Sequence, residues 1–315
     1  AGLDIDLGGM WLAPSQTRLK TFADQMGIGR YPTFLKGKSV LAMAGKRALV
    51  DGEDFTQLLT LREKIQAYLL LRRINKLLST VNDSDPWNSA NSQELDGQSV
   101  ETWLCESTSS ERLRSLIRII CASLFCAETP QVSLLFFLVY LKGGGGLETM
   151  ISADEGGGQN LLFHGGVHQI ARNMAQELGE CLHLNEPVHS INFHATETVV
   201  TTCLAQYRAK RVIVAVPPTL IHRISFTPAL PSPQAALHNR VNMGSVIKFW
   251  VAYSTPFWRQ QGFNGSIVRD DKPASPCFDV SPPDSKLGLI AGFFEADHAL
   301  HASDSSKETR RQQVI

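Results

Sequence analysis

Apolar residues recur at helical spacing in several stretches of the chain. Residues 15–26 form one such stretch, which Gly27 ends. A longer one starts near Asp54, and its apolar side rotates at Leu70, which predicts a kink or a second helix there. A polar loop is expected at residues 82–97. Further helices are predicted at residues 109–127, 130–142 and 165–179.

Alternating and β-branched residues predict strands joined by tight connections. Residues 40–50 resemble a hairpin that turns near Gly45, and short strands dominate after residue 164. The pattern predicts an α+β fold in which helical and strand-rich parts interleave along the chain. The later predicted strands are CLHL (181–184), PVHSINF (187–193), TVVTTCL (198–204), RVIVAV (211–216), GSVIKFWVAY (244–253) and LGLIAGFF (287–294).

One predicted strand carries a charge in the middle of an apolar run. Lys248 shares a face of GSVIKFWVAY with Val246 and Trp250. A buried ammonium is costly unless it is paired, hydrated or deprotonated. The strand alone leaves two interpretations open: an edge strand with Lys248 in solvent, or a lysine placed there for function.

Composition indicates a globular protein whose charges sum to no net electrostatic field. The chain has 315 residues, enough for about two domains, with 43% hydrophobic and 19% charged residues. Thirty basic residues balance thirty acidic ones, so nothing favours nucleic acid as a partner. The densest basic cluster, Arg72, Arg73 and Lys76, is predicted to be the solvated face of a helix.

No segment reads as a membrane span or a metal site. The longest apolar run, SLLFFLVYL (133–141), is shorter than a transmembrane helix and predicts a buried core helix. Six cysteines lack metal-binding spacing, so no metal is expected. Cys121 and Cys126 are predicted to be buried free thiols, which favours an intracellular, reducing compartment.

Several other motifs are predicted to be structural. GGGG (143–146) and EGGGQN (155–160) lack the Lys-Ser/Thr pair of a phosphate-binding loop. There is no GxSxG elbow, and no histidine is assigned to catalysis. The chain's two ends look cut inside a fold, and Ser305 or Ser306 is expected to cap a final helix.

Five stretches, in order along nearly the whole chain, carry a specific resemblance. They are DLGGMWLAPSQTRL (6–19), AET with QVSLLFFLVYLKGGGG (127–146), GGGQNLLFHGG (156–166), RVIVAVPPTLIHRISFTPALP (211–231) and GSVIKFWVAYSTPFWR (244–259). Together they resemble the flavin-containing amine oxidase family, which includes monoamine and polyamine oxidases. Ala13 stands where the family's first segment has a glycine.

The resemblance implies an α+β fold of the amine oxidase, or FAD-linked reductase, type. Residues 1–31 and 164–238 would form a partial FAD-binding domain. Residues 32–163 and 239–315 would form a substrate-binding domain, a mixed sheet flanked by helices. The family's N-terminal GxGxxG unit and its C-terminal flavin-binding segment have no counterpart, so the chain resembles a central fragment.

The resemblance also implies site residues. Lys248 would be the catalytic residue, facing the flavin and acting in its reoxidation by dioxygen. The implied cofactor-binding residues are Gly8, Gly9, Met10 and Trp11 along the flavin ring, Val188 at the adenine, and Ala215 and Val216 at the dinucleotide. The implied substrate residues are Ile151, Gln159 and Phe278, with Ile120 and Leu124 as weaker candidates.

The implied reaction is oxidation of an amine to an imine, with hydride transfer to FAD and reoxidation by dioxygen to hydrogen peroxide. The implied partners are a small amine and dioxygen, and a homodimer is left open. Two alternatives remain: another FAD-dependent oxidase or desaturase of the same superfamily, such as a porphyrinogen oxidase, or a non-catalytic fragment or degenerate binding module. The GSVIK and PFW blocks favour the amine oxidase over the other flavoenzymes.

Overall fold

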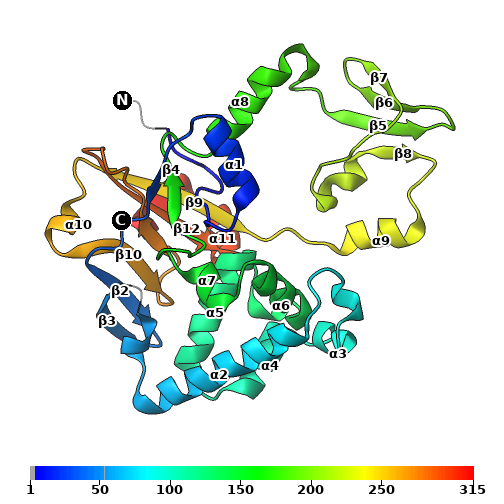
Figure 1. The fold of residues 1–315 in the computed structure, drawn as a ribbon. Coiled ribbons are helices and arrows are strands. Elements are labelled where there is room, and N and C mark those ends of the chain that lie inside the picture. Colours follow the sequence, from blue (N-terminus) through cyan, green and yellow to red (C-terminus); the bar gives the residue numbers. More distant parts are fainter. Residues whose placement is uncertain (1–3, 53) are drawn as a thin grey trace. The chain divides into compact units, whose positions relative to one another are not determined.

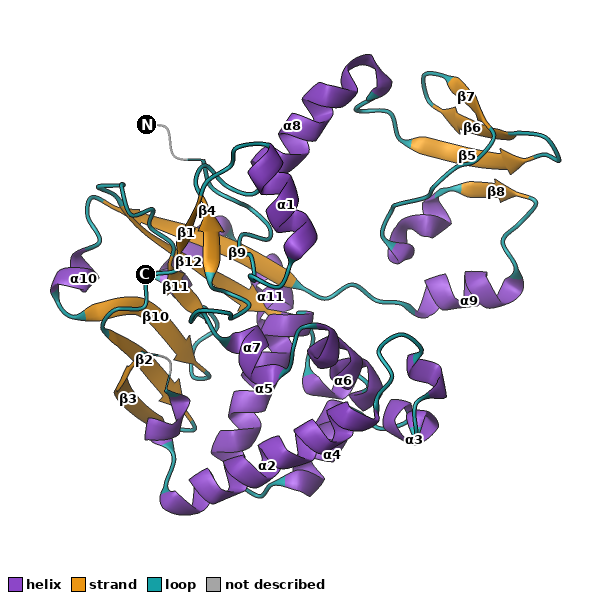
Figure 2. Cartoon of the chain, in the orientation of Figure 1, coloured by secondary structure: helices purple, strands orange, loops and turns teal. Residues whose placement is uncertain are grey.

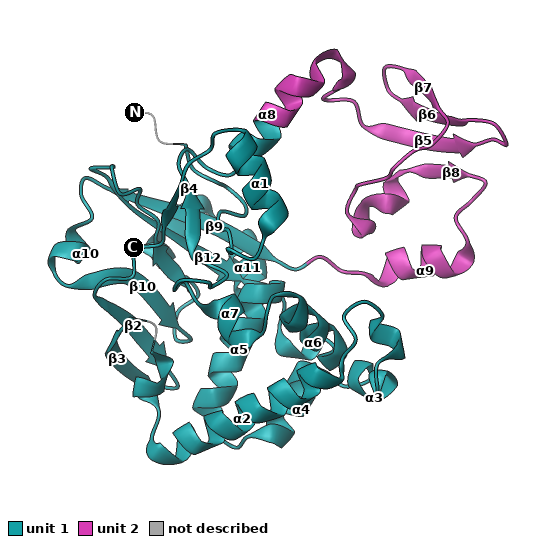
Figure 3. Cartoon of the chain, in the orientation of Figure 1, with its two compact units in different colours: residues 1–172, 244–315 teal, residues 173–243 magenta. Residues whose placement is uncertain are grey.

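The computed structural model describes residues 4–52 and 54–315. It forms two compact units, unit 1 (residues 1–172 and 244–315) and unit 2 (residues 173–243), shown in Figure 3. The first three residues of the predicted cut end lie outside the described residues. Among the described residues, no helix combines the length and apolar character that a membrane crossing requires.

Unit 1 contains a mixed six-stranded sheet with the order β3-β2-β10-β11-β12-β9 (Figure 1). β10 pairs with β2 in parallel, and the other neighbours are antiparallel. β9 is therefore an edge strand that pairs only with β12 in this sheet. The strands are β2 (Lys38–Met43), β3 (Lys46–Asp51), β9 (Val246–Tyr253), β10 (Phe263–Arg269), β11 (Cys277–Asp279) and β12 (Gly288–Glu295).

Two further strands of unit 1, β1 (Arg30–Pro32) and β4 (Leu161–Phe163), pair antiparallel. Leu12 adds a bridge to Leu161, which ties the N-terminal segment to β4. The other elements of unit 1, drawn in Figure 2, are α1 (Thr17–Gln25), η1 (Phe55–Leu58), α2 (Leu61–Thr80), η2 (Pro86–Asn88), α3 (Ser92–Asp96), α4 (Val100–Ser107), α5 (Glu111–Phe125), η3 (Thr129–Gln131), α6 (Leu134–Gly143), α7 (Leu147–Ile151), α10 (Phe257–Gln260), α11 (Ala296–Ser303) and α12 (Lys307–Val314).

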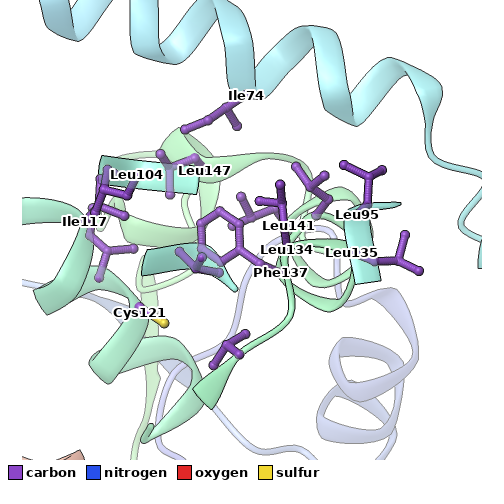
Figure 4. Packing of buried hydrophobic residues seen from close by; sticks show 14 of the residues in the cluster. Ile74, Leu95, Leu104, Ile117, Cys121, Leu134, Leu135, Phe137, Leu141 and Leu147 are labelled. Atoms are coloured by element: carbon purple, nitrogen blue, oxygen red, sulfur yellow. The ribbon is translucent and has the colours of Figure 1, made fainter. Parts of the chain in front are cut away.

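Helices α2 to α7 share one apolar core, centred on α6. Phe137 is fully buried, and Figure 4 shows its ring surrounded by aliphatic side chains. These include Ile74 from α2, Leu104 from α4 and Ile117 from α5. The SLLFFLVYL run is thus the buried core helix that its length predicted.

Unit 2 contains a four-stranded sheet with the order β7-β6-β5-β8. α8 (His168–Leu178) begins in unit 1 and ends in unit 2. The other elements of unit 2 are η4 (Gly179–Cys181), β5 (Val188–Phe193), β6 (Thr198–Thr202), β7 (Gln206–Ala209), η5 (Pro218–Arg223), β8 (Ser225–Thr227) and α9 (Ser232–Arg240).

Many predicted elements are present within a few residues of their expected bounds. The 40–50 hairpin is β2 and β3, and Ser306 caps α12 by accepting from the Thr309 N–H. Arg72, Arg73 and Lys76 are exposed on α2, as predicted for a solvated face.

Some secondary-structure predictions were wrong. No second helix begins at Leu70: α2 is one continuous helix across it, because its sequence contains no Gly or Pro to interrupt the helical hydrogen bonds, and the alternative of a kink stays a prediction. CLHL and RVIVAV form no strand, since no described segment pairs with them, and Ile213 is 93% exposed. The 82–97 loop contains η2 and α3, because Leu95 is buried in the helical core.

Candidate functional site

A cavity of about 320 Å³ in unit 1 lies against one face of β9 and β12. The antiparallel register pairs Lys248 with Phe293 and Val246 with Glu295, and all four side chains line this cavity. Its full lining is Leu7, Gly8, Gly9, Met10, Trp11, Ser123, Cys126, Gln159, Val246, Lys248, Pro276, Phe278, Phe293 and Glu295. We call it the Lys248 cavity.

Lys248 points from the edge strand across this cavity to the N-terminal segment. Its Nζ donates to the carbonyl oxygen of Gly8 at 2.8 Å and lies 3.1 Å from Met10 Sδ. The ammonium also lies 5.0 Å from the ring centre of Trp250 and 5.8 Å from that of Phe293. The edge position of β9 is confirmed, but Lys248 is half-buried and faces a cavity, not open solvent, and its functional role stays a prediction.

The electrostatic setting weakens the positive charge of Lys248. Burial lowers its pKa from 10.5 to about 8, and the charge of Asp6 opposes that shift. No acidic side chain among the described residues forms an ion pair with it within 4.0 Å. Lys248 can therefore bind or release a proton at Nζ near pH 8.

The segment before Met10 is fixed at several points. The Asp6 carboxylate accepts from the backbone N–H groups of Val167, at 3.0 Å, and His168, at 3.3 Å, where α8 begins. The Trp250 indole donates to the Asp6 carbonyl oxygen at 3.2 Å. Trp250 and Lys248 stand two residues apart on one face of β9, so they bind the carbonyl groups of Asp6 and Gly8 in succession.

The residues expected to face a flavin ring leave room for one. A Cβ added to Gly8 or Gly9 would meet nothing within 4 Å. Trp11 Nε1 is buried without a hydrogen-bond partner, and its ring packs edge-on against Phe278 with ring centres 5.1 Å apart. A flat heterocycle that carries acceptor atoms suits this place. It could lie along the open backbone of Gly8 and Gly9, near the indole N–H of Trp11 and the ammonium of Lys248. These residues fit the ring of a flavin.

A second cavity, of about 80 Å³, adjoins the first and shares Ser123, Gln159, Pro276 and Phe278 with it. Its wall is mostly apolar and includes Ile120, Leu124 and Ile151. The backbone carbonyl of Gln159 accepts from the Thr33 hydroxyl at 2.6 Å, which fixes the position of the segment that carries it. An apolar chamber of this kind suits the hydrocarbon part of a ligand.

The predicted site residues separate into three groups. The Lys248 cavity brings together Gly8, Gly9, Met10, Trp11, Gln159, Lys248 and Phe278. Ile151 lines the adjoining cavity and not the Lys248 cavity. Val188, at the start of β5, and Ala215 and Val216, in the exposed segment before η5, belong to unit 2, and their expected contacts with a dinucleotide stay predictions.

Sequence reasoning missed half of the cavity wall, namely Leu7, Ser123, Cys126, Val246, Pro276, Phe293 and Glu295. Ser123 and Cys126 come from the end of α5, and Phe293 and Glu295 from the end of β12. A usable signal existed for Glu295, because it is an acidic residue that directly follows the apolar run LGLIAGFF. This signal is weaker than that of Lys248, which stands inside an apolar run and not at its end.

Comparison with known proteins places the chain among flavoenzymes. A family model described as flavin containing amine oxidoreductase matches residues 1–315. The chain is 33% identical over 313 residues to probable flavin-containing monoamine oxidase A of Dictyostelium discoideum, covering 99% of this chain and 68% of that protein. It is 32% identical over 323 residues to flavin-containing amine oxidase B of Sus scrofa, covering 98% of this chain and 60% of that protein. The chain thus spans about two thirds of such relatives.

Solved structures show the same fold. A putrescine oxidase structure bound to putrescine superposes with a TM-score of 0.92 and 26% identity, covering 98% of this chain and 69% of that chain. Cyclohexylamine oxidase from Brevibacterium oxydans gives a TM-score of 0.90 and 25% identity, covering 99% of this chain and 69% of that chain. The expected α+β fold is confirmed.

Proposed function

The chain belongs to the flavin-containing amine oxidoreductase family, and we propose that it forms the amine-oxidising site of an FAD-dependent amine oxidase. The observation that carries this proposal is the half-buried Lys248, which points into a largely apolar cavity at the Gly8 carbonyl. FAD is the cofactor of this family, and Gly8, Gly9, Met10, Trp11 and Lys248 are the residues of the Lys248 cavity proposed to contact it.

When bound, FAD would supply the redox chemistry: uptake of a hydride from the amine, whose nitrogen also loses a proton to leave the imine, and return of two electrons with two protons to dioxygen to give hydrogen peroxide. Lys248 places a proton and a positive charge beside the Gly8 segment. A cation fixed at a point where negative charge develops stabilises that charge without reorganisation. Lys248 therefore has the character of a residue that assists electron transfer to dioxygen.

The rest of the cavity binds and orients the amine. The Trp11 and Phe278 rings, packed edge-on, form an aromatic wall beside Phe293, whose ring centre lies 6.4 Å from that of Trp11. Apolar walls favour the neutral form of the reacting amine, which is the form that can lose a hydride. Gln159 and Phe278 line both cavities, so they lie where a substrate would pass from one to the other.

The test is made on the purified protein. Its visible absorbance is measured before and after FAD is added and free cofactor is removed, and amine-dependent peroxide formation is then followed. We expect a retained flavin band that an amine bleaches without oxygen and that air restores. A retained band that no amine bleaches would overturn the amine oxidase assignment, and no retained band would overturn flavin binding.

A further inference from the structure

Glu295 places a second charged group in the wall of the Lys248 cavity. It is the last residue of β12 and is only 7% exposed. Glu295 stands two residues beyond Phe293, the residue of β12 that pairs with Lys248 of β9. The side chains of Glu295 and Phe293 therefore lie on the same face of the sheet as that of Lys248. Same-face positions along a strand are about 7 Å apart, so the carboxyl and the ammonium lie at different places along the cavity wall.

The fold makes little use of this carboxyl group. Glu295 precedes α11 as its N-cap residue, yet its side chain accepts no hydrogen bond from that helix. The Glu128 carboxylate instead accepts a hydrogen bond from the backbone N–H of Asp297 in α11, at 3.3 Å. Within the described residues, the one hydrogen bond to the Glu295 carboxyl comes from the Ser123 hydroxyl at 2.7 Å, and no Lys, Arg or His forms an ion pair with it.

A buried carboxyl with a single hydroxyl partner has unused acceptor capacity. An ionised carboxylate offers about four acceptor sites, and Ser123 fills one of them. Burial raises the pKa of Glu295 to about 8, and the hydrogen bond from Ser123 only partly offsets this. A cation that entered the cavity would restore the ionised form through a charge-assisted hydrogen bond.

We propose that Glu295 and Ser123 form a subsite that binds a second, protonated amino group of the substrate, so that the preferred substrates are short α,ω-diamines. The inference rests on the proposed function, since it assumes that the first amino group reacts near Lys248. Glu295 then sets substrate preference through binding and takes no part in the transfer of electrons. A monoamine with an apolar tail leaves the carboxyl without its ionic partner.

The test compares n-alkylamines with diaminoalkanes of the same carbon number and with the matching amino alcohols. Specificity constants (kcat/KM) for peroxide formation are measured with the FAD-loaded protein near pH 8.5, where Glu295 and the second amine are largely charged. We expect a preference of about tenfold or more for the diamine over the monoamine, with the amino alcohol between them. Glu295→Gln should abolish that preference mainly through KM.

Two further variants separate recognition from folding. Ser123→Ala should weaken the diamine preference less than Glu295→Gln, because it removes a partner of the carboxylate and leaves the charge. Glu308→Gln, in the exposed helix α12, is the matched control and should leave the preference unchanged. Equal use of diamine and monoamine by the unmodified protein, or an equal loss for both in Glu295→Gln, would overturn the proposal.

Calorimetric titration with the same diamines measures the subsite without turnover. Weaker diamine binding in Glu295→Gln than in the unmodified protein supports the subsite even where no amine yields peroxide, a result that would count against the proposed function alone. Undetectable diamine binding to the unmodified protein, or equal binding to both proteins, would overturn the subsite.

Discussion

The ammonium of Lys248 donates to the carbonyl oxygen of Gly8 across 240 positions of sequence, at 2.8 Å. This bond joins the edge strand β9 to the N-terminal segment whose backbone is expected to lie along a flavin. Because burial holds the pKa of Lys248 near 8, the bond is made by a group that can lose its charge in the physiological range.

Replacing Lys248 should separate the two halves of the proposed reaction. Lys248→Met removes the cation and keeps an apolar chain, so flavin reoxidation by dioxygen should slow by about tenfold or more while reduction by the amine changes little. In the unmodified protein, the reoxidation rate should fall as pH rises through about 8, where Lys248 loses its charge, and this dependence should vanish in the variant. Stopped-flow absorbance measures both half-reactions.

The control for that experiment is Lys286→Met, which changes an exposed lysine outside the cavity. It should reproduce the rates and the pH profile of the unmodified protein. Equal slowing of reduction and reoxidation in Lys248→Met would contradict a role confined to the dioxygen step.

Glu295 should make the folded protein less stable as pH rises towards 8. Its pKa is raised from 4.5 to about 8, chiefly by burial, so the folded state keeps a proton that the unfolded chain loses. The stability that the protonated Glu295 gives the folded state is fully present below about pH 4.5 and is lost as pH rises to about 8. Over this range the free energy of unfolding should fall by at most about 1.4 kcal/mol per pH unit. Urea unfolding between these limits measures it.

In Glu295→Gln this part of the slope should disappear, whereas Glu308→Gln should keep it. Between pH 8 and 10.5 the lowered pKa of Lys248 acts in the opposite direction, because the folded state then favours the neutral amine. The comparison is therefore confined to the lower range. An unchanged slope in Glu295→Gln would show that the carboxyl is already ionised in the folded protein.

Asp279 should be critical for stability although it performs no chemistry. It is 2% exposed and accepts from Trp258 Nε1 at 2.8 Å, Arg259 Nε at 2.6 Å and the Ser281 hydroxyl at 2.6 Å. Asp279→Ala leaves the buried donors without their acceptor and should cost about 3–5 kcal/mol in the free energy of unfolding.

Asp284→Ala is the matched surface control, since the side chain of Asp284 is 78% exposed. It should change the free energy of unfolding by about 0.5 kcal/mol or less. Urea denaturation compares the two, and similar small effects in both variants would show that the Asp279 network is dispensable. The network also fixes β11, which places the neighbouring Phe278 in the cavity wall.

Gly244 should tolerate no side chain. A Cβ at this position would overlap the carbonyl oxygen of Phe125 and lie 2.8 Å from Cys126 Cβ, at the end of α5. The Ser245 N–H donates to the Cys126 carbonyl at 2.7 Å, so the two backbones cannot separate without losing a hydrogen bond. Gly244→Ala should therefore cost about 1–3 kcal/mol and lower the Tm.

Gly143→Ala provides the comparison, because a Cβ at the last residue of α6 would meet nothing within 4 Å. It should leave the Tm unchanged or raise it slightly, since alanine restricts the unfolded chain. Thermal unfolding followed by circular dichroism distinguishes the two variants. A Tm for Gly244→Ala equal to that of the unmodified protein would rule out the close approach.

Local pattern determined much of the secondary structure. Helical spacing identified α1, α5, α6 and α8, because their hydrogen bonds form within the segment that carries the signal. The same reasoning erred at RVIVAV, whose β-branched composition favours a strand but cannot supply a partner. A helix can be predicted from its own residues, whereas a strand depends on another segment.

The sequence by itself determined that Lys248 was anomalous and, through the DLGG and GSVIK motifs, which family the chain resembles. Only the tertiary structure decided what the lysine contacts and which residues share its cavity. The β9–β12 register placed Glu295 on the same face, and the end of α5 brought Ser123 within 2.7 Å of it across 172 positions. A charged residue inside an apolar run can be recognised from the sequence alone. Its contacts depend on how segments far apart in the sequence pack together, which the sequence pattern does not show.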